Sequence, residues 1–239
     1  MENGLENPHE ATLINPNQSE IMMEHFMIMS YNVSIVTRQL AYGNEGTFMR
    51  RQFLHAVEEN PIIAAVKDNE GLEKACKMGE LTVIFVLYGD ICSIGGIVNR
   101  IQQAGKLAMV HMDLVTGLSA KEVSVDYLRD TAGADGIITT KAAMTTYAKE
   151  QGLYTVLRFF VIDSLALQSI ENLGKQRGAK PDFIEVLPGV MPKVIRKICT
   201  DVRIPVIAGG LIADKEDVMG ALAAGAAAVS TTNQDVWTL

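Results

Sequence analysis

The amino-acid sequence predicts an α/β fold of the (β/α)8 class, a compact TIM barrel with a short eighth helix. Three observations lead to this prediction. Eight short apolar runs alternate with helical stretches of 10 to 15 residues between Pro61 and the C-terminus. Two segments 92 residues apart resemble each other, which is the spacing of half a barrel. The chain of 239 residues, 48% hydrophobic and 21% charged, has the composition of one globular domain.

The eight apolar runs are the expected strands. Each is rich in β-branched or aliphatic residues and is bounded by Gly, Asp, Ser or Pro. Such runs are typical of parallel strands that are covered on both faces. In chain order they cover residues 62–67, 82–88, 107–114, 136–140, 154–161, 183–187, 205–210 and 227–232. Consecutive units of this kind form either a closed barrel or a doubly wound sheet.

The internal echo favours the barrel. Residues 132–140 (AGADGIITT) and 224–232 (AGAAAVSTT) are identical at five of nine positions. They contain the expected fourth and eighth strands, so the repeat corresponds to half of an eight-unit barrel. The region from Pro61 onward has 179 residues, fewer than the roughly 200 usual for this fold. We therefore expect short loops and an eighth helix confined to residues 233–239.

The first 52 residues differ from the rest and are expected to form an N-terminal appendage, with the barrel domain at residues 53–239. Asn-Pro pairs are followed by a short Met-rich stretch at 21–29 that allows only two or three helical turns. Met49 would also serve as a translation start for a domain that begins near Phe53. We expect the appendage to contribute little to the core.

Charge and cysteine content argue against several functions. Residues 1–48 carry six glutamates and one arginine, so they account for −5 of the net charge of −7. The other 20 basic and 22 acidic side chains give a nearly neutral barrel, without the strongly basic surface typical of nonspecific nucleic-acid binding. Three cysteines without CxxC spacing predict reduced thiols. We expect no metal site and no cofactor.

The location predicted from the sequence is the cytoplasm. No apolar run approaches the roughly 18 residues that a membrane-spanning helix needs. The first residues are acidic, whereas a secretory signal begins with basic residues. We therefore expect no contact with a membrane.

Polar side chains recur at the ends of the expected strands, where TIM barrels carry their functional groups. They are Lys67 after the first strand, His111 and Asp113 on the third, Thr139, Thr140 and Lys141 at the fourth, Arg158 and Asp163 at the fifth, and Glu185 within the sixth. One such residue alone is more often a solvated strand end or half of a buried pair. Because several converge on one rim, we expect a polar ligand pocket.

The ends of the last two expected strands form the most specific local pattern. Gly209 and Gly210 follow the seventh strand, where glycine lets backbone N–H groups approach an anion closely. The eighth strand ends in hydroxyl residues and an asparagine that precedes a short helix: Ser230, Thr231, Thr232 and Asn233. N–H groups and a helix N-terminus favour a phosphate. The alternative is an ordinary turn beside ordinary β-forming residues.

Other chemical patterns are weak. No G-x-S-x-G, HExxH or DxD pattern occurs, and we assign no catalytic residue. Lys67 and Lys141 are placed to form a Schiff base, although pairing with phosphate or carboxylate is the more common role.

A basic cluster lies away from the rim. Lys193, Arg196 and Lys197 share one face of the expected sixth helix. Such a face is usually only solvated, and RNA binding there is the weaker interpretation.

Taken in order, the motifs resemble a known bacterial family, the glycerol-3-phosphate-responsive antiterminators, or glycerol uptake operon antiterminator regulatory proteins. The segments that carry the resemblance are PIIAAVK at 61–67, HMDLVTGL at 111–118, DGIITTK at 135–141, RFFVIDS at 158–164, PDFIEVLPG at 181–189, PVIAGGLI at 205–212 and STTN at 230–233, with Trp237. The resemblance covers residues 53–239, and residues 1–48 have no counterpart.

This resemblance implies a barrel that binds glycerol-3-phosphate as an effector and acts on the leader mRNA of glycerol genes. The phosphate would lie on the backbone at 209–210 and 231–233. Asp113, Glu185, Arg158 and Lys67 would hold the glycerol hydroxyls or one another. The oligomeric state is left open, a homo-oligomer included.

An alternative function is a phosphosugar isomerase, aldolase or transferase on the same barrel. It would use Asp113 or Glu185 as a base and Lys67 as an electrophile. Fold and phosphate pattern alone do not separate an enzyme from a regulator.

Overall fold

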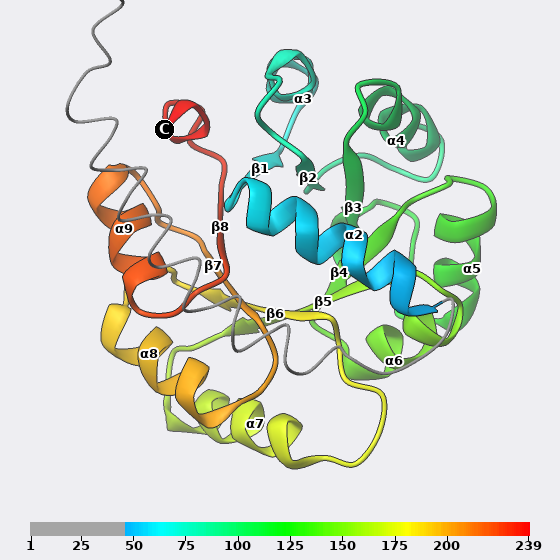
Figure 1. The fold of residues 1–239 in the computed structure, drawn as a ribbon. Helices are drawn as coiled ribbons and strands as arrows, with labels where there is room; N and C mark the ends of the chain where they lie inside the picture. Colours follow the sequence, from blue (N-terminus) through cyan, green and yellow to red (C-terminus); the bar gives the residue numbers. More distant parts are fainter. Residues whose placement is uncertain (1–45) are drawn as a thin grey trace, which may run out of the picture.

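The protein folds as a closed barrel of eight parallel strands (Figure 1), seen in a computed structural model that describes residues 46–239. Residues 1–45, most of the predicted appendage, lie outside the described residues. Each strand pairs with the next one along the chain. The (β/α)8 class predicted from the sequence is therefore confirmed.

All eight predicted strands are present. They are β1 (Ile62–Val66), β2 (Val83–Val86), β3 (Leu107–His111), β4 (Gly136–Thr139), β5 (Tyr154–Phe160), β6 (Phe183–Leu187), β7 (Val206–Gly209) and β8 (Ala228–Thr231). The third predicted range is too long. β3 ends at His111 because Met112–Leu114 form a short 3-10 helix, η1.

Helices alternate with the strands and surround the barrel (Figure 1). They are α2 (Gly46–Glu59), α3 (Asn69–Lys77), α4 (Ile94–Gln103), α5 (Glu122–Asp130), α6 (Ala142–Glu150), α7 (Ser164–Lys175), α8 (Pro192–Asp201) and α9 (Lys215–Ala223). The described chain ends in a 3-10 helix, η2 (Val236–Thr238), which confirms the short eighth helix.

The pairing of β1 with β8 closes the barrel. Ile62 pairs with Val229 and Ala64 pairs with Thr231. The internal echo marks equivalent positions in the two halves, because Gly133 and Gly225 both adopt positive φ, 69° and 105°, shortly before β4 and β8. Positive φ is a conformation that glycine adopts without steric cost, which explains why the echo retains these two glycines.

The helix α2 covers the N-terminal end of the barrel, the end at which each strand begins (Figure 1). Its Phe53 and Val57 are buried against inward-facing strand residues such as Phe85 and Met109. The centroids of the Phe53 and Tyr154 rings are 5.3 Å apart. The helix spans the predicted boundary between residues 52 and 53, and it seals the floor of the barrel with apolar side chains.

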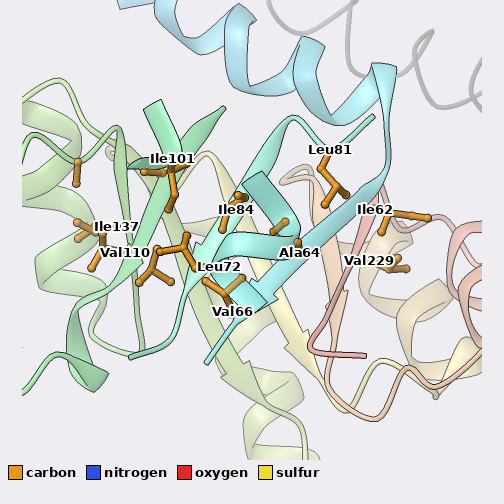
Figure 2. Packing of buried hydrophobic residues seen from close by; sticks show 14 of the residues in the cluster. Ile62, Ala64, Val66, Leu72, Leu81, Ile84, Ile101, Val110, Ile137 and Val229 are labelled. Atoms are coloured by element: carbon orange, nitrogen blue, oxygen red, sulfur yellow. The ribbon is translucent and has the colours of Figure 1, made fainter. Parts of the chain in front are cut away.

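A second apolar layer fills the space between the sheet and the helices. Residues that alternate with the inward set, such as Ile62, Ala64 and Val66 of β1, point outward, and Ile62 lies beside Val229 of β8 (Figure 2). Leu72 of α3 and Ile101 of α4 belong to the same layer and are fully buried. Each large side chain buried in this way contributes about 1.5–3 kcal/mol, so the outer layer stabilises the closed sheet.

Acidic residues just before two strands help to fix the strand register. Asp135 accepts a hydrogen bond from the backbone N–H of Ala108 at 2.8 Å. Asp182 accepts one from Thr155 N–H at 3.0 Å. Each carboxylate therefore ties the start of its own strand to the preceding strand.

Three helices begin with an aspartate cap. Asp68, Asp163 and Asp214 accept hydrogen bonds from the N–H groups of Gly71, Ala166 and Asp217, respectively. These caps satisfy one of the otherwise unpaired N–H groups at each helix start. None of the helices in residues 46–239 is long and apolar enough to span a membrane.

Candidate functional site

A buried polar cluster lies inside the barrel toward the C-terminal ends of the strands. Arg158 on β5 and Glu185 on β6 pair directly in the sheet register. Arg158 Nε donates to Glu185 Oε2 at 2.6 Å, and the two side chains are only 8% and 1% exposed. Ser230 on β8 donates its hydroxyl to Glu185 Oε1, also at 2.6 Å. Three of the predicted site residues therefore form one network across the barrel interior.

Gly209 at the end of β7 makes this network possible. A Cβ atom at this position would lie 2.6 Å from both Glu185 Oε1 and Ser230 Oγ, which is far closer than van der Waals contact. Any larger residue would therefore push the carboxylate and hydroxyl apart. The role of Gly209 is to leave room for a buried hydrogen bond.

The terminal nitrogens of Arg158 remain available. Within the described part of the chain, only Nε of this guanidinium has a hydrogen-bond partner, and Arg158 has five N–H donors in total. A guanidinium with free terminal donors can bind an anionic group in a bidentate manner. The network thus holds Arg158 in place while its outer edge stays free.

His111 is the last residue of β3 and lies near this cluster. Its side chain is 3% exposed, and its Nδ1 atom is buried without a hydrogen-bond partner among residues 46–239. Burial and, after it, the positive charge of Arg158 lower the pKa of His111 to about 4, while Asp113 and a contact with the residue's own backbone act in the opposite direction. The imidazole is therefore neutral at pH 7.

Asp113 lies in η1 and is held by the end of β4. Thr139 Oγ1 donates to Asp113 Oδ1 at 2.8 Å, and both the N–H and the hydroxyl of Thr140 donate to Oδ2, at 2.7 and 2.9 Å. Burial alone would raise the pKa of Asp113, but the hydrogen bonds from Thr140 and Thr139 outweigh it, and the pKa is lowered. The carboxylate is ionised and fixes the strand end.

The loops after β7 and β8 present unused N–H groups. Gly210 has φ 74° and the next residue, Leu211, has φ 63° although it carries a side chain. In the described hydrogen-bond network, the backbone N–H groups of Gly210, Leu211 and Thr232 have no acceptor. Consecutive N–H groups in such a turn form an anion-binding concavity. The glycine and hydroxyl pattern predicted a phosphate site at these two loops, and that site stays a prediction.

Two predicted phosphate ligands instead hold the loops together. The Thr231 hydroxyl donates to the carbonyl oxygen of Ile212 at 2.8 Å and accepts from Asn233 N–H at 3.0 Å. The Asn233 side-chain amide donates to the carbonyl oxygen of Ala213 at 2.7 Å. These bonds join the β8 loop to the β7 loop, so the hydroxyl and amide are already used within the protein.

The remaining predicted pocket residues lie at the rim. Lys67 and Lys141 are exposed after β1 and β4. Asp163 is also exposed, and its carboxylate is the cap of α7, bonded to Ala166 N–H at 3.0 Å. Sequence reasoning placed all three in the pocket because it could locate a strand end but not the direction of its side chain.

The predicted basic face of α8 is exposed but partly neutralised. Lys197 Nζ lies 2.7 Å from Glu171 and 2.5 Å from Asp201, and hydrogen bonds to Asp201 and then Glu171 raise its pKa. Arg196 reaches the carbonyl oxygen of Ala223 at 3.4 Å, and Lys193 is exposed. The positive field of this face therefore comes mainly from Lys193 and Arg196.

Exposed apolar residues gather at the same end of the barrel as the site. Most of the large apolar side chains that are exposed in residues 52–239 lie at or shortly after the C-terminal end of a strand: Ile91, Leu114, Phe160, Ile162, Leu165 and Leu211. The other two are Val123 in the first turn of α5 and the last residue, Leu239. Sequence reasoning missed this apolar rim. The sequence could have indicated them, because each is a large apolar residue among polar residues soon after an expected strand.

No metal-binding group of His, Cys, Asp and Glu occurs in the part of the chain that the structure describes.

Comparison with known proteins identifies relatives along the whole barrel. Residues 62–237 match the family described as glycerol-3-phosphate responsive antiterminator. The chain is 47% identical over 186 residues to the uncharacterized protein YgcP of Escherichia coli, covering 78% of this chain and 96% of YgcP.

Two solved structures are also similar. A glycerol uptake operon antiterminator regulatory protein from Listeria monocytogenes is 34% identical with a TM-score of 0.70, covering 75% of this chain and 95% of that one. A glycerol uptake operon antiterminator-related protein from Thermotoga maritima is 36% identical with a TM-score of 0.63, covering 74% and 98%. More distant barrels, including enzymes at 14–16% identity, share the fold alone. The chain therefore belongs to the glycerol-3-phosphate responsive antiterminator family.

Proposed function

We propose that this protein binds glycerol-3-phosphate at the C-terminal mouth of the barrel and, in the bound form, acts on leader mRNA of glycerol genes as a transcription antiterminator. The phosphate binds to the N–H groups of Gly210, Leu211 and Thr232, with Arg158 as the cationic partner. The glycerol part extends toward the interior cluster. The protein works in the cytoplasm without a metal or a cofactor.

The observation that carries this proposal is the set of unused N–H groups after β7 and β8. Hydrogen bonds between N–H groups and an ionised phosphate are stronger than bonds to a neutral hydroxyl. Leu211 strengthens the argument, because a non-glycine residue at positive φ is strained and such strain clusters at ligand sites. The family to which the chain belongs agrees with this ligand.

Calorimetry with glycerol-3-phosphate, glycerol and inorganic phosphate tests the ligand. Glycerol-3-phosphate should bind at least tenfold more tightly than glycerol, because charged hydrogen bonds contribute about 1.5–3 kcal/mol each. Equal affinity for the two would reject the phosphate site.

The Gly210→Ala variant locates the site. Its Cβ would lie 3.2 Å from Leu187 in a backbone with φ 74°, beside the anion. Gly105→Ala is the matched control, because Gly105 has the same φ of 74° but open space around it, in the turn between α4 and β3. Both variants place a side chain at the same φ, but only Gly210 lies at the proposed site, so only Gly210→Ala should lose ligand affinity.

Regulation of RNA binding requires only that the ligand prefers one state of the protein. A leader-RNA binding assay with and without glycerol-3-phosphate, at fixed salt, tests this step. The α8 face with Lys193, Arg196 and Lys197 is the RNA surface proposed from the sequence. Removing these charges should weaken RNA binding and reduce its salt dependence, since fewer counterions are released.

The geometry favours a regulator over the phosphosugar enzyme. Glu185, one of the two expected bases, already accepts hydrogen bonds from Arg158 and Ser230 on both oxygens. Asp113, the other, has a lowered pKa and three donors. A carboxylate that is fully paired is a weak general base. A turnover assay run beside the RNA assay separates the two functions, since substrate conversion would identify the enzyme.

A further inference from the structure

Apart from the free terminal nitrogens of Arg158, the polar side-chain atoms of the barrel interior are paired with one another, except at one atom. Glu185 has two donors, and Ser230 is one of them. Asp113, which lies at the rim, has three donors. His111 Nδ1 is the only side-chain nitrogen or oxygen that is buried without a partner within residues 52–239. Buried polar atoms are nearly always hydrogen-bonded, so an exception of this kind points to a partner outside the chain.

The surroundings of His111 determine what that partner can be. Arg158 is close enough to disfavour a second positive charge, so the ring stays neutral. A neutral imidazole has one N–H donor and one acceptor nitrogen, which suits a neutral hydroxyl. An anionic group would instead be drawn to the free donors of Arg158 and to the N–H groups after β7 and β8. The two parts of a phosphorylated alcohol thus have different binding partners.

We infer that His111 is a specificity-determining residue that binds, through Nδ1, a hydroxyl of a phosphorylated polyol whose phosphate lies on the β7 and β8 loops. This inference rests on the proposed function, since it assigns the hydroxyl of the same ligand. His111 ends β3 and faces the interior, so the hydroxyl lies inside the mouth. The terminal torsion of a histidine is broad, and the ring can turn toward the ligand without backbone movement.

A comparison of two ligands on matched variants tests the assignment. The ligands are glycerol-3-phosphate and 3-hydroxypropyl phosphate, which lacks the middle hydroxyl. The wild-type protein should bind the deoxy ligand about 10- to 100-fold more weakly, because that ligand leaves the buried nitrogen unpaired. His111→Leu should bind both ligands with nearly equal affinity, because it has no polar atom to lose.

Two polar variants show which ring nitrogen is responsible. The amide of asparagine lies at about the same distance along the side chain as Nδ1, and that of glutamine at about the distance of Nε2. His111→Asn should therefore keep much of the discrimination between the ligands, and His111→Gln should lose it. Rescue by Asn but not by Gln is a result that a purely structural histidine would not give.

Thermal unfolding of each variant without ligand separates folding from binding. His111→Leu removes an unpaired polar atom from the interior, so its melting temperature should not fall while its ligand discrimination does. If wild-type and His111→Leu proteins discriminate equally between the ligands, the inference is wrong and the proposed function stands. If glycerol-3-phosphate binds no better than glycerol to the wild-type protein, both the proposed function and the inference fail.

Discussion

Glu185 carries its charge in the barrel interior, where an isolated carboxylate would be unstable. Arg158 and Ser230 each meet one of its oxygens, at 2.6 Å. Buried pairs of this kind often add little net stability, because desolvation offsets the attraction, whereas removing one partner costs about 3–5 kcal/mol. The network is therefore better explained as a device that fixes the orientation of Arg158 than as a source of stability.

The neutral state of His111 predicts a loss of stability at acidic pH. Its pKa is about 4 in the folded protein, against 6.5 for the ordinary group. Between these values the unfolded chain binds more protons, so stability is fully present above pH 6.5 and falls as the pH drops toward 4. The difference corresponds to about 3 kcal/mol.

Urea unfolding at pH 7 and pH 4.5 checks this prediction against His111→Leu as the control. The wild-type protein should lose more stability on acidification than the variant does. Parallel losses in the two proteins would show that other groups cause the acid sensitivity.

At the scale of elements, the first turns of α3, α7 and α9 show the same construction. Each follows a strand end and starts with an aspartate that accepts a hydrogen bond from the third residue of the helix. A strand end rich in polar residues is therefore a mixture of ligand groups and helix caps. The Asp163 side chain belongs to the caps by its contact with Ala166.

Asp163→Ala should destabilise the protein by about 1 kcal/mol, the usual cost of a lost N-cap. Asp163→Asn should retain most of the stability, because asparagine also caps helices well. Neither change should alter glycerol-3-phosphate affinity. Chemical denaturation and calorimetry on the same samples measure both effects, and a large drop in affinity for the Ala variant would return Asp163 to the pocket.

The helix α2 illustrates how a segment outside the β/α repeat can be essential to it. Phe53 is 1% exposed, and its ring lies 4.7 Å from that of Phe183. Phe53→Ala should lower the free energy of unfolding by about 3–5 kcal/mol, because it leaves a cavity. Gln52→Ala, at an exposed neighbouring position, should change stability by no more than about 0.5 kcal/mol.

Denaturant midpoints of the two variants provide the comparison. Equal midpoints would mean that the floor repacks around the missing ring. Removal of residues 1–48 should change the free energy of unfolding little, as the sequence predicts.

At the scale of the whole molecule, the fold was largely predictable from the sequence. Strands covered on both faces leave a strong apolar signal, and the echo between β4 and β8 depends on glycines that the turns require. The floor was not predictable, because Phe53 and Val57 read as an ordinary amphipathic helix until the barrel above them is closed. Thr231 was also unpredictable, since its hydroxyl bonds to Ile212, which lies in a different loop.

For the candidate site, the sequence indicates which strands contribute polar side chains but not how the atoms are arranged. Arg158, Glu185 and Ser230 lie at alternate strand positions that face the barrel interior. This alternation can be recognised in the sequence. The caps and the unpaired nitrogen of His111 depend on torsion angles and on neighbours from other strands. These features follow only from three-dimensional packing.

Linkage between the two proposed partners gives a test of the whole molecule. If glycerol-3-phosphate tightens RNA binding by some factor, typically 5- to 150-fold, RNA must tighten ligand binding by the same factor. Calorimetric titration of the ligand with and without saturating leader RNA measures this coupling. Different factors in the two directions would show that the assays report different states of the protein.

The packing of α2 against the strands closes the N-terminal end of the barrel with apolar side chains such as Phe53. The ligand proposed for the C-terminal mouth would therefore enter and leave past the loops that carry Phe160, Ile162 and Leu211. If the proposed RNA covers these loops, the proposed ligand cannot leave before the RNA does. The dissociation rate of glycerol-3-phosphate should then fall when RNA is bound.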